Sequence, residues 1–289
     1  MKAAPFAYSR PADVDEACAL LAADDGARII AGGQSLVPMM AMRLARPSRL
    51  VDIARIASLS YVREDKDGVA VGACTRQCVV ERDAVVAKRV PLLARAMPFI
   101  GHAATRARGT VGGSLAHADP AAELPLIAVT LDAALAYRAG GKDHEIAARD
   151  FFTGLMTTAL PPGACLTGLR FPVWQGKVGS GFHEVNARRS DFAFVAAAAQ
   201  IELDGGGNCK RIAIGVGAAT ETPIRLDAAE RELTGGALDA ASVGKAVRAA
   251  LADIAPLDDL HASAEYRRRA ASALAVRAVA DAKANAYAH

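Results

Sequence analysis

The sequence predicts an α+β protein that is built from two domains. Its 289 residues, 52% of them apolar, are enough for a substantial core and for more than one domain. Helix and strand signals alternate along the first part of the chain, whereas the last part has a hairpin signal followed by helices. Pro172 and the glycine-rich residues 176–181 form the clearest break. We therefore expect domains at residues 1–175 and 176–289.

The first domain is expected to consist of two subdomains that meet near residue 55. Asp13 to Glu16 resembles a capping box, and apolar residues follow it at helical spacing. The apolar run 27–31 predicts a strand that ends abruptly in two glycines, and residues 50–53 predict another strand. In the second subdomain, the expected strands are 69–72, 133–137 and 165–171, the expected helices are 75–81, 85–97 and 121–131, and residues 106–114 are expected to form a loop.

The second domain is expected to contain an antiparallel sheet followed by helices. Residues 182–186 and 193–203 have extended patterns, and the chain then turns through three consecutive glycines into another extended run at 211–217. Glycines at such a turn are typical of a β-hairpin. The remainder, from Asp227 on, predicts three helices, with clear helical periodicity near 239–254 and 263–286.

Composition and charge argue against several classes of function. With 34 basic and 31 acidic residues, the net charge of +3 is too small to indicate binding to nucleic acid or to a membrane surface. Aromatic residues make up 5% of the chain, which also disfavours stacking on bases. Residues 1–11 lack the apolar region of a secretory signal, and the alanine-rich residues 192–200 are too few to span a bilayer. We expect a cytoplasmic protein without an integral membrane segment.

The five cysteines indicate neither a metal centre nor a disulfide framework. Cys18, Cys74, Cys78, Cys165 and Cys209 are scattered and odd in number, and no Cys-x-x-Cys occurs. Structural zinc and iron–sulfur clusters need about four converging ligands. We therefore interpret the cysteines as buried or free thiols of a reducing compartment and expect no metal in this chain.

Two glycine segments carry the chemistry of the chain. Ala31-Gly-Gly-Gln-Ser35 directly follows a predicted strand, and Gly109-Thr-Val-Gly-Gly-Ser114 lies in the predicted loop. Paired glycines allow a positive φ and a close approach of the backbone to a ligand, and successive N–H groups form a cradle for an anion. No Lys follows the glycines as in a P-loop, and neither segment matches the Rossmann pattern. The residues alone leave two interpretations open: a pyrophosphate site, or two ordinary turns.

Both segments continue into longer motifs that resemble a known family. Ala31-Gly-Gly-Gln-Ser-Leu-Val-Pro-Met-Met-Ala-Met-Arg-Leu-Ala-Arg-Pro47 is similar to the first FAD loop of molybdenum hydroxylase flavoproteins. Thr105-Arg-Ala-Arg-Gly-Thr-Val-Gly-Gly-Ser-Leu-Ala-His-Ala-Asp-Pro-Ala-Ala-Glu-Leu-Pro125 is similar to the second. The resemblance covers nearly the whole chain. The medium subunits of aerobic carbon monoxide dehydrogenase are nearer in pattern than the FAD domain of xanthine dehydrogenase.

The resemblance implies a two-subdomain FAD-binding fold of the vanillyl-alcohol-oxidase/PCMH type, followed by a C-terminal domain. It also implies that the FAD pyrophosphate lies between the two glycine segments and is held mainly by backbone amides. Other matching positions pack near the flavin ring, contact it through the backbone, or stand where the family usually has an Asp that holds FAD. The residues assigned to FAD in this way are Ala31, Gly32, Gly33, Gln34, Ser35, Ile100, Gly101, Thr110, Gly112, Gly113, Ser114, Glu123, Leu166, His183, Asp191 and Phe192.

Some of these residues depart from the family pattern. Glu123 is one methylene longer than the usual Asp. His183 is assigned to a position where the family commonly has Lys, and an imidazole balances the negative charge of a flavin differently. An ordinary position on a surface strand is the alternative for His183. Phe192 follows Asp191 where the family often has Asp-Tyr, so it lacks the hydroxyl group. His117 and Asp119 lack a third ligand and do not indicate a metal.

The resemblance implies an FAD-carrying electron-transfer subunit of a heterotrimeric molybdenum hydroxylase. A small subunit would hold iron–sulfur clusters, a large one would hold the molybdenum cofactor, and the whole assembly would be doubled. The flavin supplies the chemistry, so we expect no catalytic side chain in this chain. The substrate and the terminal acceptor (quinone, oxygen or NAD) stay open. The alternatives are a stand-alone FAD-dependent oxidoreductase and a non-catalytic nucleotide-binding assembly module.

Overall fold

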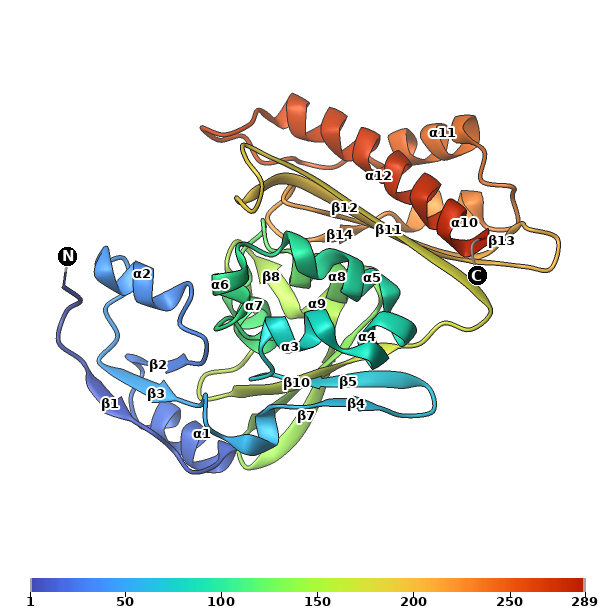
Figure 1. Ribbon diagram of the computed structural model, residues 1–289. Coiled ribbons are helices and arrows are strands. Elements are labelled where there is room, and N and C mark those ends of the chain that lie inside the picture. Colours follow the sequence, from blue (N-terminus) through green and yellow to red (C-terminus); the bar gives the residue numbers. More distant parts are fainter. Residues whose placement is uncertain (1, 288–289) are drawn as a thin grey trace.

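A computed structural model describes residues 2–287. Figure 1 shows three parts that follow one another along the chain. The first part is a three-stranded parallel sheet in the order β1-β3-β2 with two helices. Asp13 begins α1 as predicted, because its carboxylate accepts a hydrogen bond from the Glu16 N–H at 2.8 Å. The elements are β1 (Ala7–Ser9), α1 (Val14–Ala22), β2 (Ala27–Ile30), α2 (Leu36–Ala41) and β3 (Arg49–Asp52).

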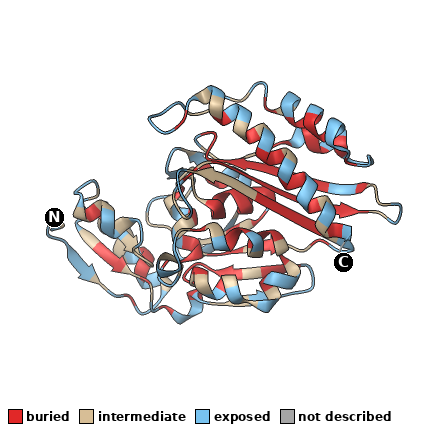
Figure 2. Cartoon of the chain, turned by 45° about the horizontal axis from the view of Figure 1, so that its top comes forward, coloured by how far each residue is buried: buried red, intermediate tan, exposed pale blue. Residues whose placement is uncertain are grey.

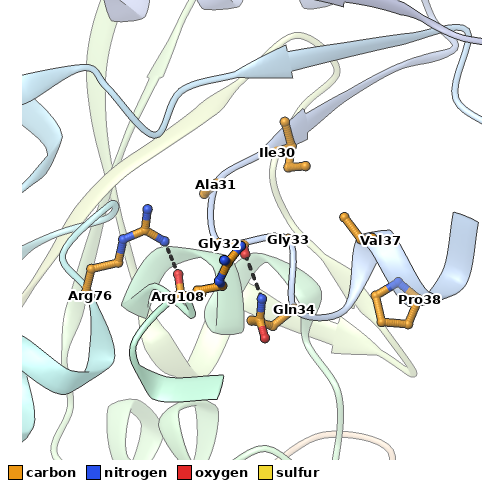
Figure 3. A pocket seen from close by; sticks show the side chains of 9 residues that line it. All are labelled: Ile30, Ala31, Gly32, Gly33, Gln34, Val37, Pro38, Arg76 and Arg108. Atoms are coloured by element: carbon orange, nitrogen blue, oxygen red, sulfur yellow. Dashed lines mark hydrogen bonds between the residues drawn. The ribbon is translucent and has the colours of Figure 1, made fainter. Parts of the chain in front are cut away.

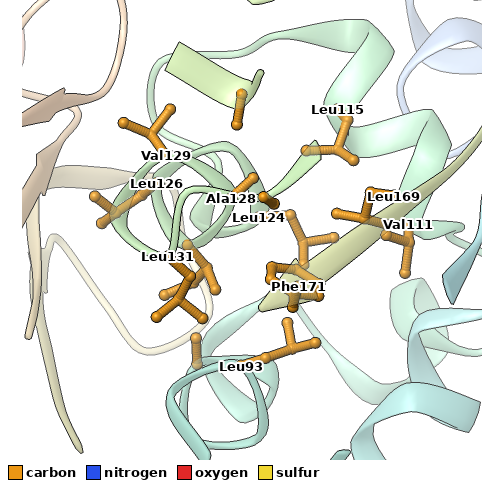
Figure 4. Close-up of a cluster of buried hydrophobic side chains, with 14 of the residues drawn as sticks. Leu93, Val111, Leu115, Leu124, Leu126, Ala128, Val129, Leu131, Leu169 and Phe171 are labelled. Atoms are coloured by element: carbon orange, nitrogen blue, oxygen red, sulfur yellow. The ribbon is translucent and has the colours of Figure 1, made fainter. Parts of the chain in front are cut away.

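The second part is a five-stranded antiparallel sheet whose order is β4-β5-β10-β6-β7. Short helices cover it, and α8 lies in the core with every residue buried (Figures 1 and 4). Its elements are η1 (Ala57–Leu59), β4 (Val62–Glu64), β5 (Gly68–Gly72), α3 (Gln77–Arg82), α4 (Ala84–Arg89), α5 (Pro91–Ala96), η2 (Met97–Phe99), α6 (Ala103–Arg106), α7 (Val111–His117), α8 (Glu123–Thr130), β6 (Ala134–Ala139), β7 (Lys142–Ala147), α9 (Ala148–Phe151), β8 (Phe152–Gly154), β9 (Thr157–Thr158) and β10 (Cys165–Pro172).

The third part is a four-stranded sheet in which consecutive strands pair antiparallel. The hairpin through Gly205–Gly207 joins its two middle strands, as predicted. Three helices follow, and the last one lies along β11 and β12 (Figure 1). The elements are β11 (Lys177–Asn186), β12 (Ala193–Leu203), β13 (Cys209–Gly217), β14 (Ile224–Arg225), α10 (Asp227–Leu233), α11 (Ala240–Ala250) and α12 (Ala264–Tyr287).

The third sheet is covered on both faces, which explains the run of small buried residues in β12. One face packs on α12, and the other packs on α5 and α8 of the second part. All of β12 except Phe194 is buried, and Figure 2 shows the buried colour along the strands between the two layers. A strand that is buried on both faces reads as a continuous apolar run rather than an alternating one.

Two predicted segments differ from the structure. The helix expected over residues 85–97 is divided into α4 and α5, because Pro91 cannot donate a helical hydrogen bond and instead begins a new helix. The loop expected over residues 106–114 instead contains the end of α6 and the first turn of α7. The edge strand β7 was not predicted, because its exposed polar side chains lack an apolar alternation. Within the part of the chain that the structure describes, no helix is long and apolar enough to cross a membrane.

Candidate cofactor-binding site

The first glycine segment is a tight turn between β2 and α2. Gly33 has a φ of +70°, a conformation that side chains with a Cβ rarely adopt. The amide of Gln34 donates to the carbonyl of Gly32 at 3.1 Å, so this side chain folds back onto the turn (Figure 3). Ser35 stands at the start of α2 without a side-chain capping bond. The positive φ that the paired glycines predict is therefore found at Gly33.

The second glycine segment is the first turn of α7. Thr110 caps the helix, since its Oγ1 accepts a hydrogen bond from the N–H of Gly113 at 3.1 Å. A Cβ on Gly112 would lie 2.5 Å from the Cβ of Ala73, so this glycine allows close packing of α7 on the chain after β5. Ser114 lies in the same helix.

The two segments touch each other through their backbones. A Cβ on Gly32 would lie 2.5 Å from the carbonyl oxygen of Arg108 and 2.8 Å from the Cα of Gly109. A pocket of about 410 Å³ opens at this contact (Figure 3). Its lining consists of Ile30, Ala31, Gly32, Gly33, Gln34, Val37, Pro38, Arg76 and Arg108. The pocket thus joins a turn of the first part to the segment that precedes α7.

Two arginines make this pocket cationic. Arg76 lies at the start of α3 and donates to the carbonyl oxygen of Arg108. Within residues 2–287, neither guanidinium is within 4 Å of a carboxylate oxygen. Guanidinium groups bind phosphates with charge-assisted hydrogen bonds. The sequence gives no signal for Arg76, because only the bridge between Arg76 and Thr110 brings it beside the second glycine segment.

A second cluster lies at the far end of α7, around the start of α8. Glu123 is 8% exposed, and burial raises the pKa of its carboxyl group to about 7. Arg106 binds Glu81 through two hydrogen bonds of 2.8 and 2.9 Å and also donates to the carbonyls of Ile100 and Gly101. This arginine holds the turn after η2 in place.

Glu184 is a further buried carboxyl group, and it is not among the residues assigned to FAD from the sequence. It lies on β11, two residues after Phe182, whose ring lies 4.9 Å from that of Phe99. Burial, and to a smaller extent the negative charge of Glu123, raise the pKa of Glu184 to about 8. The strand alternation of β11 is the signal that pairs Glu184 with Phe182 on one face.

The structure does not bring His183 to this cluster. Its Nε2 lies 2.9 Å from Oδ2 of Asp281 on α12. Side chains alternate along a strand, so His183 lies on the α12 face of β11, opposite to Phe182 and Glu184. This geometry matches the alternative of an ordinary strand position and gives no support to a role in balancing the flavin charge.

The remaining assigned residues are spread over two places. Asp191 and Phe192 lie in the connection between β11 and β12, where Arg188 Nε lies 2.9 Å from Asp191 Oδ2 and Phe192 is 70% exposed. Hydrogen bonds from Phe192 N–H and Arg188 hold the pKa of Asp191 below its ordinary value. Leu166 lies in β10 beside a bulge and is buried. Of the residues described, no group of three or more His, Cys, Asp and Glu is arranged to hold a metal ion.

Two family models together match almost the whole chain. The model for the FAD binding domain in molybdopterin dehydrogenase matches residues 4–174. The model for the CO dehydrogenase flavoprotein C-terminal domain matches residues 180–282.

Curated relatives and solved structures agree with these models. The carbon monoxide dehydrogenase medium chain of Afipia carboxidovorans is 36% identical, over 97% of this chain and 98% of the relative. The 6-hydroxypseudooxynicotine dehydrogenase complex subunit alpha of Paenarthrobacter nicotinovorans is 35% identical, over 98% of this chain and 96% of the relative. A solved carbon monoxide dehydrogenase of Hydrogenophaga pseudoflava has a chain that is 32% identical, with a TM-score of 0.95 and 99% of both chains covered. A chain of quinoline 2-oxidoreductase of Pseudomonas putida 86 is 35% identical, with a TM-score of 0.94 and 99% of both chains covered.

Proposed function

The chain belongs to the family of FAD-binding medium subunits of molybdenum hydroxylases, and we propose that it carries electrons from an iron–sulfur subunit to a terminal acceptor. It is an oxidoreductase subunit with an FAD-binding domain and a C-terminal domain. The observation that carries the proposal is the contact between Gly32 and the backbone of Arg108 and Gly109, because it joins the two glycine segments at one cationic pocket.

The residues of this pocket fit a pyrophosphate. The backbone of Gly32 and Gly33 leaves no Cβ between a ligand and the N–H groups of the turn, and a Cβ on Gly32 would collide with the second segment. Arg76 and Arg108 lie at the same pocket and supply positive charge. In the proposed binding mode, Ala31 to Ser35 and the first turn of α7, from Thr110 to Ser114, surround the phosphates.

The other end of the site is proposed for the flavin ring. Ile100 and Gly101 are assigned to it by resemblance, and Arg106 ties their two carbonyls to Glu81 on α3. Glu123 stands where the family usually has an Asp that helps to hold FAD. Leu166, Asp191 and Phe192 are assigned to the same end. Bound FAD supplies the redox chemistry there, while the chain binds and orients it. The support for His183 is weaker, since its side chain pairs with Asp281 on the other face of β11.

The names of several relatives, which are about equally similar to this chain, support its being one subunit of a larger complex. Three of them, at 35 to 36% identity, are subunits or chains of dehydrogenases of 6-hydroxypseudooxynicotine, carbon monoxide and caffeine. Such unlike substrates are consistent with a substrate site on another subunit. We propose a large molybdenum-cofactor subunit and a small iron–sulfur subunit as partners, in a dimer of heterotrimers in the cytoplasm.

The domain division is part of the same proposal. Domains at residues 1–175 and 176–289 are supported by the ends of the two family matches. A division of the first domain near residue 55 is supported by the separate sheets that β1 to β3 and β4 to β7 with β10 form. The fold of the first domain is proposed to be of the vanillyl-alcohol-oxidase/PCMH type.

Expression of the full chain with and without its two proposed partners tests the function. We expect the purified chain to show flavin absorption bands and to release FAD on denaturation, and the coexpressed complex to contain iron and molybdenum. A chain that stays colourless and fails to take up added FAD would contradict the central proposal. A stand-alone oxidoreductase would instead purify without the two partners and reduce its acceptor alone.

A further inference from the structure

Arg267 is a buried arginine that has no part in the proposed phosphate pocket. It is the fourth residue of α12 and is 4% exposed. A positive charge is unfavourable in a buried place and also near the N-terminus of a helix. The side chain therefore depends on acceptors that other segments of the chain supply, and these segments indicate its role.

The guanidinium of Arg267 binds two carbonyls and one carboxylate. One Nη donates to the carbonyl oxygen of Phe194 on β12 and, at 2.7 Å, to that of Ala218, the first residue after β13. The other Nη donates to Oδ2 of Asp259 at 2.6 Å. Because the guanidinium is planar, acceptors on three segments fix its orientation and their own distances from one another.

The two carbonyls lie where β12 and β13 stop pairing. The last pair at this end of the two strands is Ala196 and Gly217. Beyond this pair, Arg267 supplies the donor that a neighbouring strand supplies within the sheet. The arginine thus fixes two segments relative to each other at the point where they leave the sheet.

The first of these segments carries two residues that are assigned to FAD. Residues 187–192 connect β11 to β12, and Asp191 and Phe192 lie at the end of this connection, just before Phe194. Figure 1 shows that α12 begins at the end of the third sheet where this connection lies. Arg267 therefore holds the chain directly after the connection.

The second segment leads to an assigned residue in the other domain. Ala218 has a φ of +59°, a conformation that is uncommon for residues other than glycine. Its N–H donates to the carbonyl oxygen of Pro120 at 2.8 Å, while its own carbonyl accepts from Arg267. Pro120 lies between α7 and α8, three residues before Glu123. Such a backbone conformation persists only when its surroundings hold it, so the contact with Pro120 depends on Arg267.

The turn before α12 is tied to the same arginine. Asp259 accepts hydrogen bonds from the N–H groups of His261 and Ala262 at 2.8 and 3.1 Å, and the ring of His261 stacks on that of Phe194 at 6.1 Å. The side chain of Asp259 is 41% exposed. Water can therefore solvate this carboxylate when Arg267 is replaced, and the replacement leaves no deeply buried charge.

We propose that Arg267 is a positioning residue of the FAD site, which holds residues 187–192 in a fixed place relative to residues 118–122 and thereby sets how tightly FAD is bound. The proposal rests on the proposed function, because it needs Glu123, Asp191 and Phe192 to lie at the flavin end of the site. Arg267 acts through the backbone of Phe194 and Ala218.

Titration of the full chain with FAD tests this role. Arg267→Met should weaken FAD binding about tenfold, which corresponds to the loss of one charge-assisted hydrogen bond. Arg225→Met is the matched control and should keep the affinity of the wild type. Arg225 is also a buried arginine between the second and third parts, but it binds Asp132 beyond the end of α8 that is opposite to Glu123.

The visible circular dichroism of bound FAD separates positioning from stability. At saturating FAD, binding offsets a general loss of stability, so a changed spectrum reports changed surroundings of the flavin. We expect a changed spectrum in Arg267→Met and the wild-type spectrum in Arg225→Met. An unchanged spectrum in Arg267→Met, or an equal loss of affinity in both variants, would overturn the proposal.

Arg267→Lys provides the test if Arg267→Met does not fold. It keeps a cation beside Asp259, but a single ammonium group does not reproduce the planar arrangement of donors. We therefore expect weakened FAD binding and a changed spectrum in this variant also. Wild-type affinity and spectrum in Arg267→Lys would assign the effect to charge and overturn the positioning role.

Hydrogen exchange in the FAD-free chain tests the geometry separately. Peptides that contain Ala218 or residues 187–192 should exchange faster in Arg267→Met than in Arg225→Met, because the bond from Ala218 to Pro120 is weakened. Equal exchange in the two variants would overturn the proposal. Failure of the wild type to bind FAD contradicts the proposed function instead, and the exchange result then decides whether Arg267 holds the two segments.

Discussion

Single residues at the contact of the two glycine segments decide whether the proposed phosphate site exists. Gly32 has no room for a side chain, because the nearest atoms are the backbone of Arg108 and Gly109, which cannot rotate away as a side chain can. Gly33 has room, but its φ of +70° is unfavourable for other residues. Glu184 differs from both, since its environment acts on its protonation rather than on its backbone.

Replacement of Gly32 by Ala should abolish FAD retention. The new Cβ would lie 2.5 Å from the Arg108 carbonyl oxygen and would separate the two segments that line the pocket. The ratio of flavin to protein after gel filtration measures the effect. Gly205→Ala is the control, because a Cβ there meets no atom within 4 Å. Full flavin occupancy in Gly32→Ala would show that the pyrophosphate lies elsewhere.

Replacement of Glu184 by Gln should stabilise the FAD-free chain at high pH. The pKa of Glu184 rises from about 4.5 to about 8 on folding, so the folded chain binds more protons than the unfolded chain between these values. The free energy of unfolding therefore decreases as the pH rises through this window. Because Glu184 is partly solvated, we expect a gain of only about 1 kcal/mol for Glu184→Gln at pH 8.5.

Urea unfolding at pH 5 and pH 8.5 measures this difference. The gain should be small at pH 5, where Glu184 is protonated in the folded chain. Glu145→Gln on the exposed strand β7 is the matched control and should show no such gain. Equal gains at both pH values would mean that Glu184 is not buried as a neutral acid.

At the scale of elements, α7 connects the two ends of the proposed site. Its N-terminus lies beside the phosphate pocket, and the chain that follows it leads to Glu123. Val111 and Leu115 are buried in the core of the second part (Figure 4), so one face of this short helix is anchored. The helix needs its cap, because seven residues form few internal hydrogen bonds.

Replacement of Thr110 by Val should destabilise the chain by about 1 kcal/mol, because the N–H of Gly113 then loses its acceptor. It should also weaken FAD binding, since Thr110 is adjacent to the pocket backbone. Thr110→Ser keeps the oxygen and should restore most of both properties. Chemical unfolding and fluorescence titration with FAD measure the two effects. Similar behaviour of the Val and Ser variants would contradict a capping role.

In the whole molecule, an ion-pair network joins the second part to the third. The side chain of Arg225 on β14 is 8% exposed. It binds Glu230 of α10 and Asp132, the second residue after α8. Arg149 of α9 binds Asp132 and Asp227. Burial raises the pKa of Asp132, but its bonds to Arg225 and Arg149 outweigh this effect and hold the pKa below its ordinary value. The network therefore needs ionised carboxylates.

Replacement of Arg225 by Met should destabilise the chain by about 3 kcal/mol, because Glu230 would stay buried without its cation. The stabilisation from Asp132 is present above its ordinary pKa and is lost as the pH falls through its depressed folded value. The loss in Arg225→Met should therefore shrink at acidic pH. Urea unfolding at pH 7 and pH 3.5 measures it. A loss that stays the same at both pH values would assign the effect to packing.

Local signals in the sequence are enough for many elements and for the family. The carboxylate of Asp13 starts α1, three glycines turn the chain between β12 and β13, and two long motifs identify an FAD-binding protein. These features depend on residues that are close in the sequence, so they can be recognised without knowledge of the fold. The division of α4 from α5 also follows from a local signal, because Pro91 cannot continue the hydrogen bonds of α4.

Only the tertiary structure decides which distant residues meet at the site. Arg76 reaches the pocket through a bridge to Thr110, and Glu184 shares the face of β11 with Phe182, which packs against Phe99 of the second part. His183, one residue before Glu184, faces α12 instead. A shift of one position along a strand reverses the face of a side chain, and sequence spacing alone does not show which face of β11 lies towards the FAD-binding domain.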